Sequence, residues 1–179
     1  MHETGHGLYS INTSSFVPLS KKDPKTILTE AIAIMFETLV HKENLLKDSV
    51  PQKILEQFKE YEEIDQVAKF TYLLARIDFE RELYKNPNQS FEEIFKKSNL
   101  KYGITNSNNK EWFFHHLIHS PAHCFTYLVG MNLANKIYQK ARQKLGTELS
   151  ENQQTASYLK NRIFRYGGLM NEKLLKFLL

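Results

Sequence analysis

The first six residues carry a pattern that could bind a metal ion. His2 and His6 are four positions apart, so on a helix both imidazoles would lie on one face and reach a single ion. Glu3 would lie beside them, where its carboxylate could take a proton from a water molecule in the ion's open coordination position. A bound zinc ion would bring the pKa of such a water toward neutrality. The alternative is a polar stretch that binds no metal, because a pentapeptide can arise by chance in a chain with seven histidines.

A catalytic zinc ion takes three protein ligands and a water molecule, so a third ligand is expected further along the chain. Glu30 lies 24 residues after His6, and the polar segment 11–23 between them is long enough for the chain to reverse. Its neighbours are apolar, where an unpaired carboxylate would be costly and a metal ion would remove that cost. Glu37 follows on the same helical face and could accept a hydrogen bond from the outer nitrogen of a ligating histidine. The alternative for both residues is a carboxylate on the exposed side of an amphipathic helix.

A second group of chemically useful residues lies in the aromatic and histidine-rich segment 111–130. Hydrolysis of a peptide bond develops an oxyanion, and a phenol or imidazole that donates a hydrogen bond to it lowers the barrier. Tyr127 and His116 are donors of this kind. Four histidines between 115 and 123 could instead form an unrelated metal cluster or a polar surface. Cys124 is interpreted as a buried apolar thiol, because no partner base accompanies it.

Helices are expected to position all of these residues. Apolar residues recur at helical spacing, and Asp23-Pro24 and Pro121 are typical helix starts. Ser90 and Glu93 form a capping box. No strand, repeat or domain boundary is predicted, so we expect an all-α fold with one domain over residues 1–179. The expected helices are 1–10, 24–47, 52–84 with a possible bend near Glu63, a short helix from 90 followed by a loop over 98–110, 121–145, 151–165 and 170–179.

Composition narrows the function classes. The 179 residues are 41% hydrophobic with seven glycines and five prolines, which favours a helix-rich globular protein over a disordered one. The net charge of +4 comes from interspersed charges without a basic block, so no nucleic-acid partner is expected. The single cysteine excludes an internal disulfide. No apolar run of membrane-spanning length and no signal peptide are found, so we expect a cytoplasmic protein without a membrane partner.

The segments HETGHGLY and LTEAIAIMFETL together resemble the gluzincin peptidases. The nearest groups are the thimet oligopeptidase/oligoendopeptidase F family and the related angiotensin-converting enzyme family, with the Taq-type carboxypeptidases more distant. The resemblance implies a mostly helical, two-lobed fold around a deep cleft, a Zn²⁺ cofactor, the zinc ligands His2, His6 and Glu30, and the catalytic base Glu3. Ile34 departs from the converting-enzyme branch, which has an aspartate there, and Glu37 fits the oligopeptidase pattern better.

The segment His116…Pro121…Tyr127-Leu128-Val129-Gly130 is similar to the H…P…Y-x-x-G pattern of the same families. The resemblance implies that His116 and Tyr127 hold the substrate carbonyl and stabilise the tetrahedral intermediate. His115 takes this role if the register shifts by one. The residues His123, Cys124 and Phe125 depart from the family, whose members commonly carry further tyrosines there.

The resemblance also includes FTYLLARIDFERELYKNPNQSFEEIFKKSNLKYGI and RYGGLMNEKLLKFLL, so it covers nearly the whole chain but only the C-terminal part of the family's fold. The expected function is therefore zinc-dependent hydrolysis of short or unfolded peptides by the catalytic portion of a longer peptidase. The alternative is a truncated, inactive helical fragment or interaction module that still binds zinc. Its cleft face would be exposed and apolar, and would favour self-association or docking of the missing N-terminal lobe.

Overall fold

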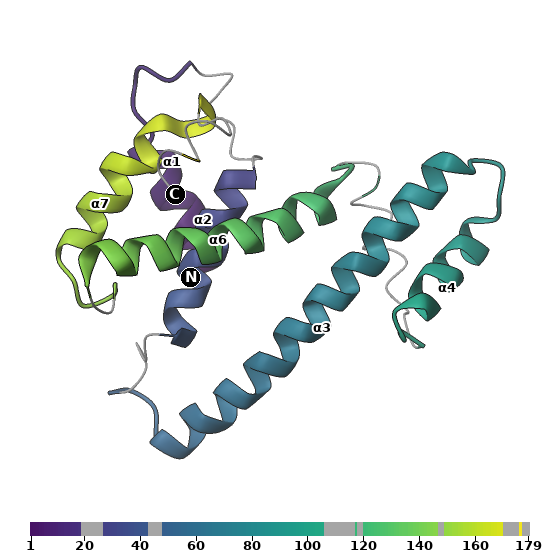
Figure 1. Cartoon of the computed structure of the whole chain (residues 1–179), viewed down its shortest axis with the longest axis horizontal. Helices are drawn as coiled ribbons and strands as arrows, with labels where there is room; N and C mark the ends of the chain where they lie inside the picture. The colour runs from purple at the N-terminus through teal and green to yellow at the C-terminus, as the bar shows by residue number, and fades with distance from the viewer. Residues whose placement is uncertain are drawn as a thin grey trace. The chain divides into compact units, whose positions relative to one another are not determined.

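The computed structural model describes residues 1–18, 27–42, 48–105, 117, 120–146, 149–169 and 176. These residues form helices joined by turns and contain no strand (Figure 1), which confirms the all-α prediction for them. No helix among them is long and apolar enough to cross a membrane. The elements in chain order are α1 (His2–Asn12), α2 (Ile27–Lys42), α3 (Gln52–Lys85), α4 (Phe91–Lys101), α6 (His123–Leu145), α7 (Gln154–Arg162) and the 3-10 segment η2 (Phe164–Leu169).

The chain divides into two compact units, which are described separately. The first unit is Met1–Gln57 together with Val129–Leu179, and the second is Phe58–Leu128. Helices α3 and α6 each contribute residues to both units. The expectation of one domain over 1–179 stays a prediction.

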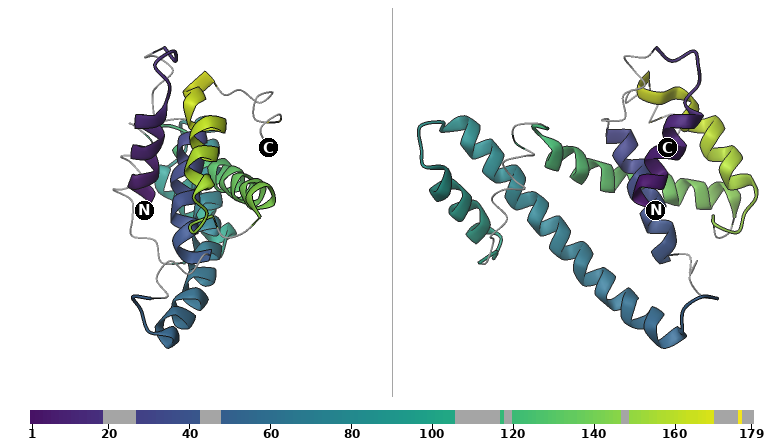
Figure 2. Two further views of the ribbon diagram at one scale, coloured as in Figure 1. Left: turned by 90° about the vertical axis from the view of Figure 1, so that its left-hand side faces the viewer. Right: turned by 180° about the vertical axis from the view of Figure 1, so that it is seen from behind.

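Helix α2 is the centre of the first unit. Its residues Ala31, Ile32, Ala33 and Met35 are fully buried, and they occupy more than one side of the helix. Helix α1 packs along α2, as both views of Figure 2 show. Tyr9 of α1 is buried too, and its ring meets that of Phe164 edge to face. The core of this unit therefore surrounds the helix that carries Glu30.

The ends of two helices in the first unit can be traced to single residues. Gly146 ends α6 with a φ of +90°, a conformation that glycine adopts readily, and the helix stops at residue 145 as predicted. Helix α1 continues to Asn12, so the prediction that a loop begins at residue 11 was wrong. The Asn12 side chain donates a hydrogen bond to the Leu8 carbonyl and the Thr13 hydroxyl donates one to the Tyr9 carbonyl, at 2.8 and 2.9 Å. The second of these bonds uses a carbonyl that the helix end would leave unpaired.

In the second unit, α4 packs against α3 through aromatic rings. Phe79 of α3 meets Phe91 and Phe95 of α4 edge to face, with ring centroids 4.9 and 5.5 Å apart, and Ile94 is buried beside them. Helix α3 is continuous through Glu63, the position of the possible bend.

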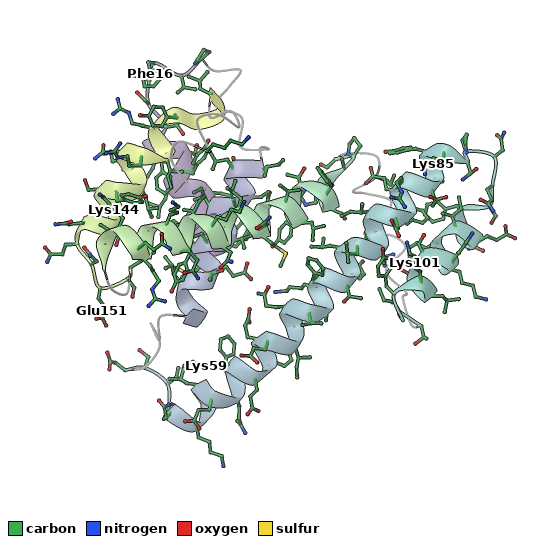
Figure 3. The ribbon with its side chains drawn as sticks, viewed as in Figure 1. Phe16, Lys59, Lys85, Lys101, Lys144 and Glu151 are labelled. Atoms are coloured by element: carbon green, nitrogen blue, oxygen red, sulfur yellow. The ribbon has the colours of Figure 1, made fainter. Side chains whose placement is uncertain are left out.

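Polar contacts attach the end of α4 to α3. Arg76 is fully buried and donates a hydrogen bond of 2.9 Å to the Asn99 side chain. Asp78 accepts hydrogen bonds from Tyr102, at 2.7 Å, and from Lys101, which Figure 3 labels. These contacts belong to a helix that extends to Lys101, so the prediction of a loop from residue 98 was wrong.

Two predicted helix starts differ in detail. Ser90 is the N-cap of α4 but makes no side-chain capping bond, so the capping box is not formed. Helix α6 begins at His123 rather than at Pro121, because Ala122 has a φ of +61°. The Ala122 amide donates a hydrogen bond of 2.7 Å to the Glu80 carboxylate. Helix α7 is shorter than the predicted 151–165, and the predicted helix 170–179 lies almost entirely outside the described residues.

Candidate metal site

The two histidines of the HExxH pattern face each other on α1. Their Nε2 atoms are 3.2 Å apart, and their rings meet edge to face with centroids separated by 4.9 Å. Without a metal ion this distance fits a hydrogen bond in which one ring donates and the other accepts. The sequence prediction that His2 and His6 share one face of a helix is confirmed.

Glu30 reaches the same point from α2. One carboxylate oxygen, Oε2, lies 3.7 Å from Nε2 of His2, and the other, Oε1, lies 3.9 Å from Nε2 of His6. Each of the three residues offers one ligand atom, and these atoms lie within 4.8 Å of one another. The fold thus joins the three predicted ligands from two helices, and their two nitrogens and one carboxylate could hold a metal ion.

Glu37 lies on the other side of the His2 ring. Its Oε2 atom is 3.5 Å from Nδ1 of His2, while Nε2 of the same ring faces Glu30. A carboxylate in this position favours the tautomer with a proton on Nδ1, which leaves the Nε2 lone pair available to a metal ion. Glu37 thus lies beside the outer nitrogen of His2, but at 3.5 Å the two make a charge contact and not the predicted hydrogen bond. The role of Glu37 in holding a ligand histidine stays a prediction.

The cluster is partly buried, so a metal ion bound there could still contact a water molecule. The side chains of His2 and His6 are 26% and 22% exposed, and that of Glu30 is 14% exposed. Nδ1 of His6 is buried and finds no hydrogen-bond partner among the residues that the structure describes. Nδ1 of His2 is also buried without a hydrogen bond to these residues, but the Glu37 carboxylate lies 3.5 Å from it.

Gly5, inside the HExxH pattern, allows the close crossing of α1 and α2. A Cβ atom at this position would lie 2.7 Å from Cα of Ala33 and 3.2 Å from the carbonyl oxygen of Ile32. Any larger residue would push the helices apart and separate the histidines from Glu30. Gly5 was not predicted to have this role, although a glycine inside a helix can signal a close contact because it weakens the helix.

The other predicted catalytic residues are Glu3, Tyr127 and His116, with His115 as the alternative to His116. Glu3 lies on α1 beside His2 and is exposed. Tyr127 is half-buried on α6 and belongs to the second unit, with its ring centroid 6.3 Å from that of His123. His116 and its alternative His115 lie outside the described residues. The roles of these residues stay predictions.

Comparison of the chain with protein-family models, with curated proteins and with solved structures gave no match. The residues of the cluster and their arrangement are therefore the basis for proposing a function.

Proposed function

We propose that this protein is a gluzincin-type zinc metallopeptidase that hydrolyses peptide bonds in short or unfolded peptides, and that it acts in the cytoplasm. The observation that carries the proposal is the convergence of His2, His6 and Glu30 from two helices, with Glu37 behind His2. This arrangement agrees with the sequence resemblance, in which HExxH lies on one helix and the ligand glutamate on the next.

The spacing of the two histidine nitrogens is compatible with a zinc ion. Zinc binds histidine nitrogen at about 2.0–2.1 Å in tetrahedral geometry, which separates two ligand atoms by about 3.3 Å. The two Nε2 atoms are 3.2 Å apart, Oε2 of Glu30 lies 3.7 Å from Nε2 of His2, and Oε1 lies 3.9 Å from Nε2 of His6. The Glu30 carboxylate would have to approach both nitrogens more closely to act as the third ligand. Two histidines and one glutamate leave the fourth position open, as catalytic rather than structural zinc sites do.

Each residue then has a defined task. A bound zinc ion would polarise the substrate carbonyl and acidify a water molecule. Glu3 would then accept a proton from that water and pass it to the leaving amine. The sequence resemblance implies that Tyr127 and His116 would donate hydrogen bonds to the oxygen on which negative charge develops. Glu37 holds the ring of His2 in its ligating orientation.

A second candidate function is a helical interaction module that binds zinc without catalysis. The first half of α3 favours it, because large apolar side chains there are exposed over nearly four turns. Lys59, labelled in Figure 3, lies in this stretch. Its most exposed apolar residues are Ile54, Tyr61, Ile64 and Val67.

Zinc content and hydrolysis of a quenched fluorescent peptide, measured together, separate the two functions. We expect wild-type protein to bind one zinc ion and to cleave the peptide, and a chelator to abolish cleavage. Glu3→Gln should bind zinc as wild type does and lose about 100-fold or more in kcat, because a general base contributes 10²–10⁴. Zinc binding without turnover would support the interaction module. Failure of the wild-type protein to bind zinc would refute both the site and the enzyme.

A further inference from the structure

We propose that Gly130 is a positioning residue for the ligand Glu30, and that the missing side chain at Gly130 determines where the Glu30 carboxylate stands. The inference rests on the proposed metal site and adds a residue of another helix to it. Gly130 lies on α6, in the part of that helix that belongs to the first unit.

The contact between the two residues is direct. A Cβ atom on Gly130 would lie 3.2 Å from Cβ of Glu30, 3.4 Å from the amide nitrogen of Ala31 and 3.5 Å from Cδ1 of Ile34. The first distance is shorter than nearly all real contacts of this type, so Glu30 would have to move by a few tenths of an ångström. Of the atoms that such a Cβ would approach, the nearest belongs to the ligand itself.

Helix α2 has little freedom to retreat from α6. Gly5 of α1 packs against the α2 backbone at Ala33 and Ile32, within one turn of Glu30. A Cβ on Gly5 would be only 2.7 Å from Cα of Ala33, so α1 and α2 are already in backbone contact. Because α2 is fixed by α1, a larger residue at 130 would displace the Glu30 side chain before it displaced the helix.

This arrangement predicts that metal affinity and fold stability respond differently to one added methyl group. Alanine stabilises the interior of a helix relative to glycine, so Gly130→Ala gains helix propensity while it creates a close contact. The contact should weaken metal binding about 10-fold, the lower end of the range for residues that hold a ligand in place. The stability of the metal-free protein should stay close to that of wild type, because the two effects oppose each other.

Three glycine-to-alanine variants test the inference on the full chain. The measurements are Zn²⁺ and Co²⁺ affinity by chelator competition, the visible spectrum of bound Co²⁺, and the thermal midpoint of the metal-free protein. Gly7→Ala is the matched control, because a Cβ there meets no atom within 4 Å. We expect Gly7→Ala to raise the midpoint and leave affinity unchanged, and Gly5→Ala to lower both. Gly130→Ala should lower affinity about 10-fold and alter the Co²⁺ spectrum without lowering the midpoint.

Two outcomes would overturn the role of Gly130. Wild-type affinity and an unchanged Co²⁺ spectrum in Gly130→Ala would show that the glycine does not position Glu30. A midpoint as low as that of Gly5→Ala would show that it serves packing. If wild-type protein binds neither metal, the proposed site itself fails. If wild type binds metal and Glu30→Gln weakens binding while Gly130→Ala does not, only the present inference fails.

Discussion

Two carboxylates in this protein are surrounded in opposite ways. Asp78 on α3 contacts Lys101, the Tyr102 hydroxyl at 2.7 Å and the Arg81 guanidinium at 3.0 Å. Glu30 on α2 faces the Nε2 atoms of two histidines at 3.7 and 3.9 Å. The first cluster contains its own cations, whereas the second brings together three groups that can each offer a lone pair.

The difference indicates which of the two carboxylates would be balanced by an added cation. The hydrogen bond from Lys101 is the largest cause that holds the pKa of Asp78 below its usual value, with help from Tyr102 and Arg81. Its charge is thus balanced by the protein itself. Around Glu30, two imidazole nitrogens and a carboxylate oxygen can each offer a lone pair to an added cation. An added metal ion should therefore bind at Glu30 and not at Asp78.

The largest effect is expected when the Glu30 carboxylate is replaced by an amide. Glu30→Gln removes the charged oxygen ligand, so zinc affinity should fall by more than about 100-fold, beyond the usual loss for an outer residue. Zinc should also cease to raise the thermal midpoint of this variant, because that rise depends on binding to the folded state. Chelator competition and thermal unfolding with and without zinc measure both quantities.

Asp78→Asn is the matched control for this prediction, since it makes the same chemical change in a cluster that has its own cations. It should bind zinc with wild-type affinity. Equal losses of zinc affinity in the two variants would mean that neither carboxylate is a specific ligand, and the contrast between the clusters would be lost.

A smaller effect is expected at Glu37, behind His2. Glu37→Gln keeps the size of the side chain but removes the charge that favours a proton on Nδ1 of His2. We expect zinc affinity to fall by about 10–100-fold while binding stays one to one. An affinity equal to that of wild type would show that the 3.5 Å approach of Glu37 has no part in holding the ligand.

The smallest effect is expected on the fold, in the second unit. Asp78→Asn should reduce the free energy of unfolding by about 1–2 kcal/mol at pH 6, because it removes hydrogen bonds to a charged acceptor. The pKa of Asp78 is lower in the folded than in the unfolded chain, so its stabilisation is fully present above the unfolded value of about 3.8. It is lost as the pH falls through the lower folded pKa.

Urea unfolding of wild type and Asp78→Asn across this pH range measures the contribution. The difference between the two proteins should be largest at pH 6 and should shrink below pH 4. A difference that stayed constant down to pH 2 would contradict the assignment, because a protonated Asp78 no longer attracts its cationic partners.

Tyr9 of α1 is held in the core of the first unit by packing. Burial raises the pKa of Tyr9 to about 12, against a smaller lowering effect of Thr29. Tyr9 follows His6 by three residues and His2 by seven, so helical spacing places it on the same face of α1 as the two histidines. One face of this helix therefore carries both the proposed ligands and a buried core residue. The sequence predicted the helix, and the packing of Tyr9 on Phe164 required the folded chain.

The sequence by itself determined what depends on local spacing. It placed His2 and His6 on one helical face, because i and i+4 side chains meet in any α-helix. It also placed Glu30 and Glu37 on the following helix and Gly146 at the end of α6. The end of α1 at Asn12 was missed, since alternatives of similar energy compete at helix ends. The start of α4 after Ser90 was predicted, but the side-chain capping bond expected there is not formed.

Only the tertiary structure decided how close the helices come. The approach of Glu30 to the histidines depends on Gly5 meeting the backbone at Ala33, and on Gly130 meeting Glu30 itself. These contacts join residues far apart in the chain, and their distances are set by the packing of whole helix faces rather than by any local hydrogen bond. The spacing of residues therefore predicted which side chains could bind a metal ion, and the helix crossings brought their ligand atoms within reach of one.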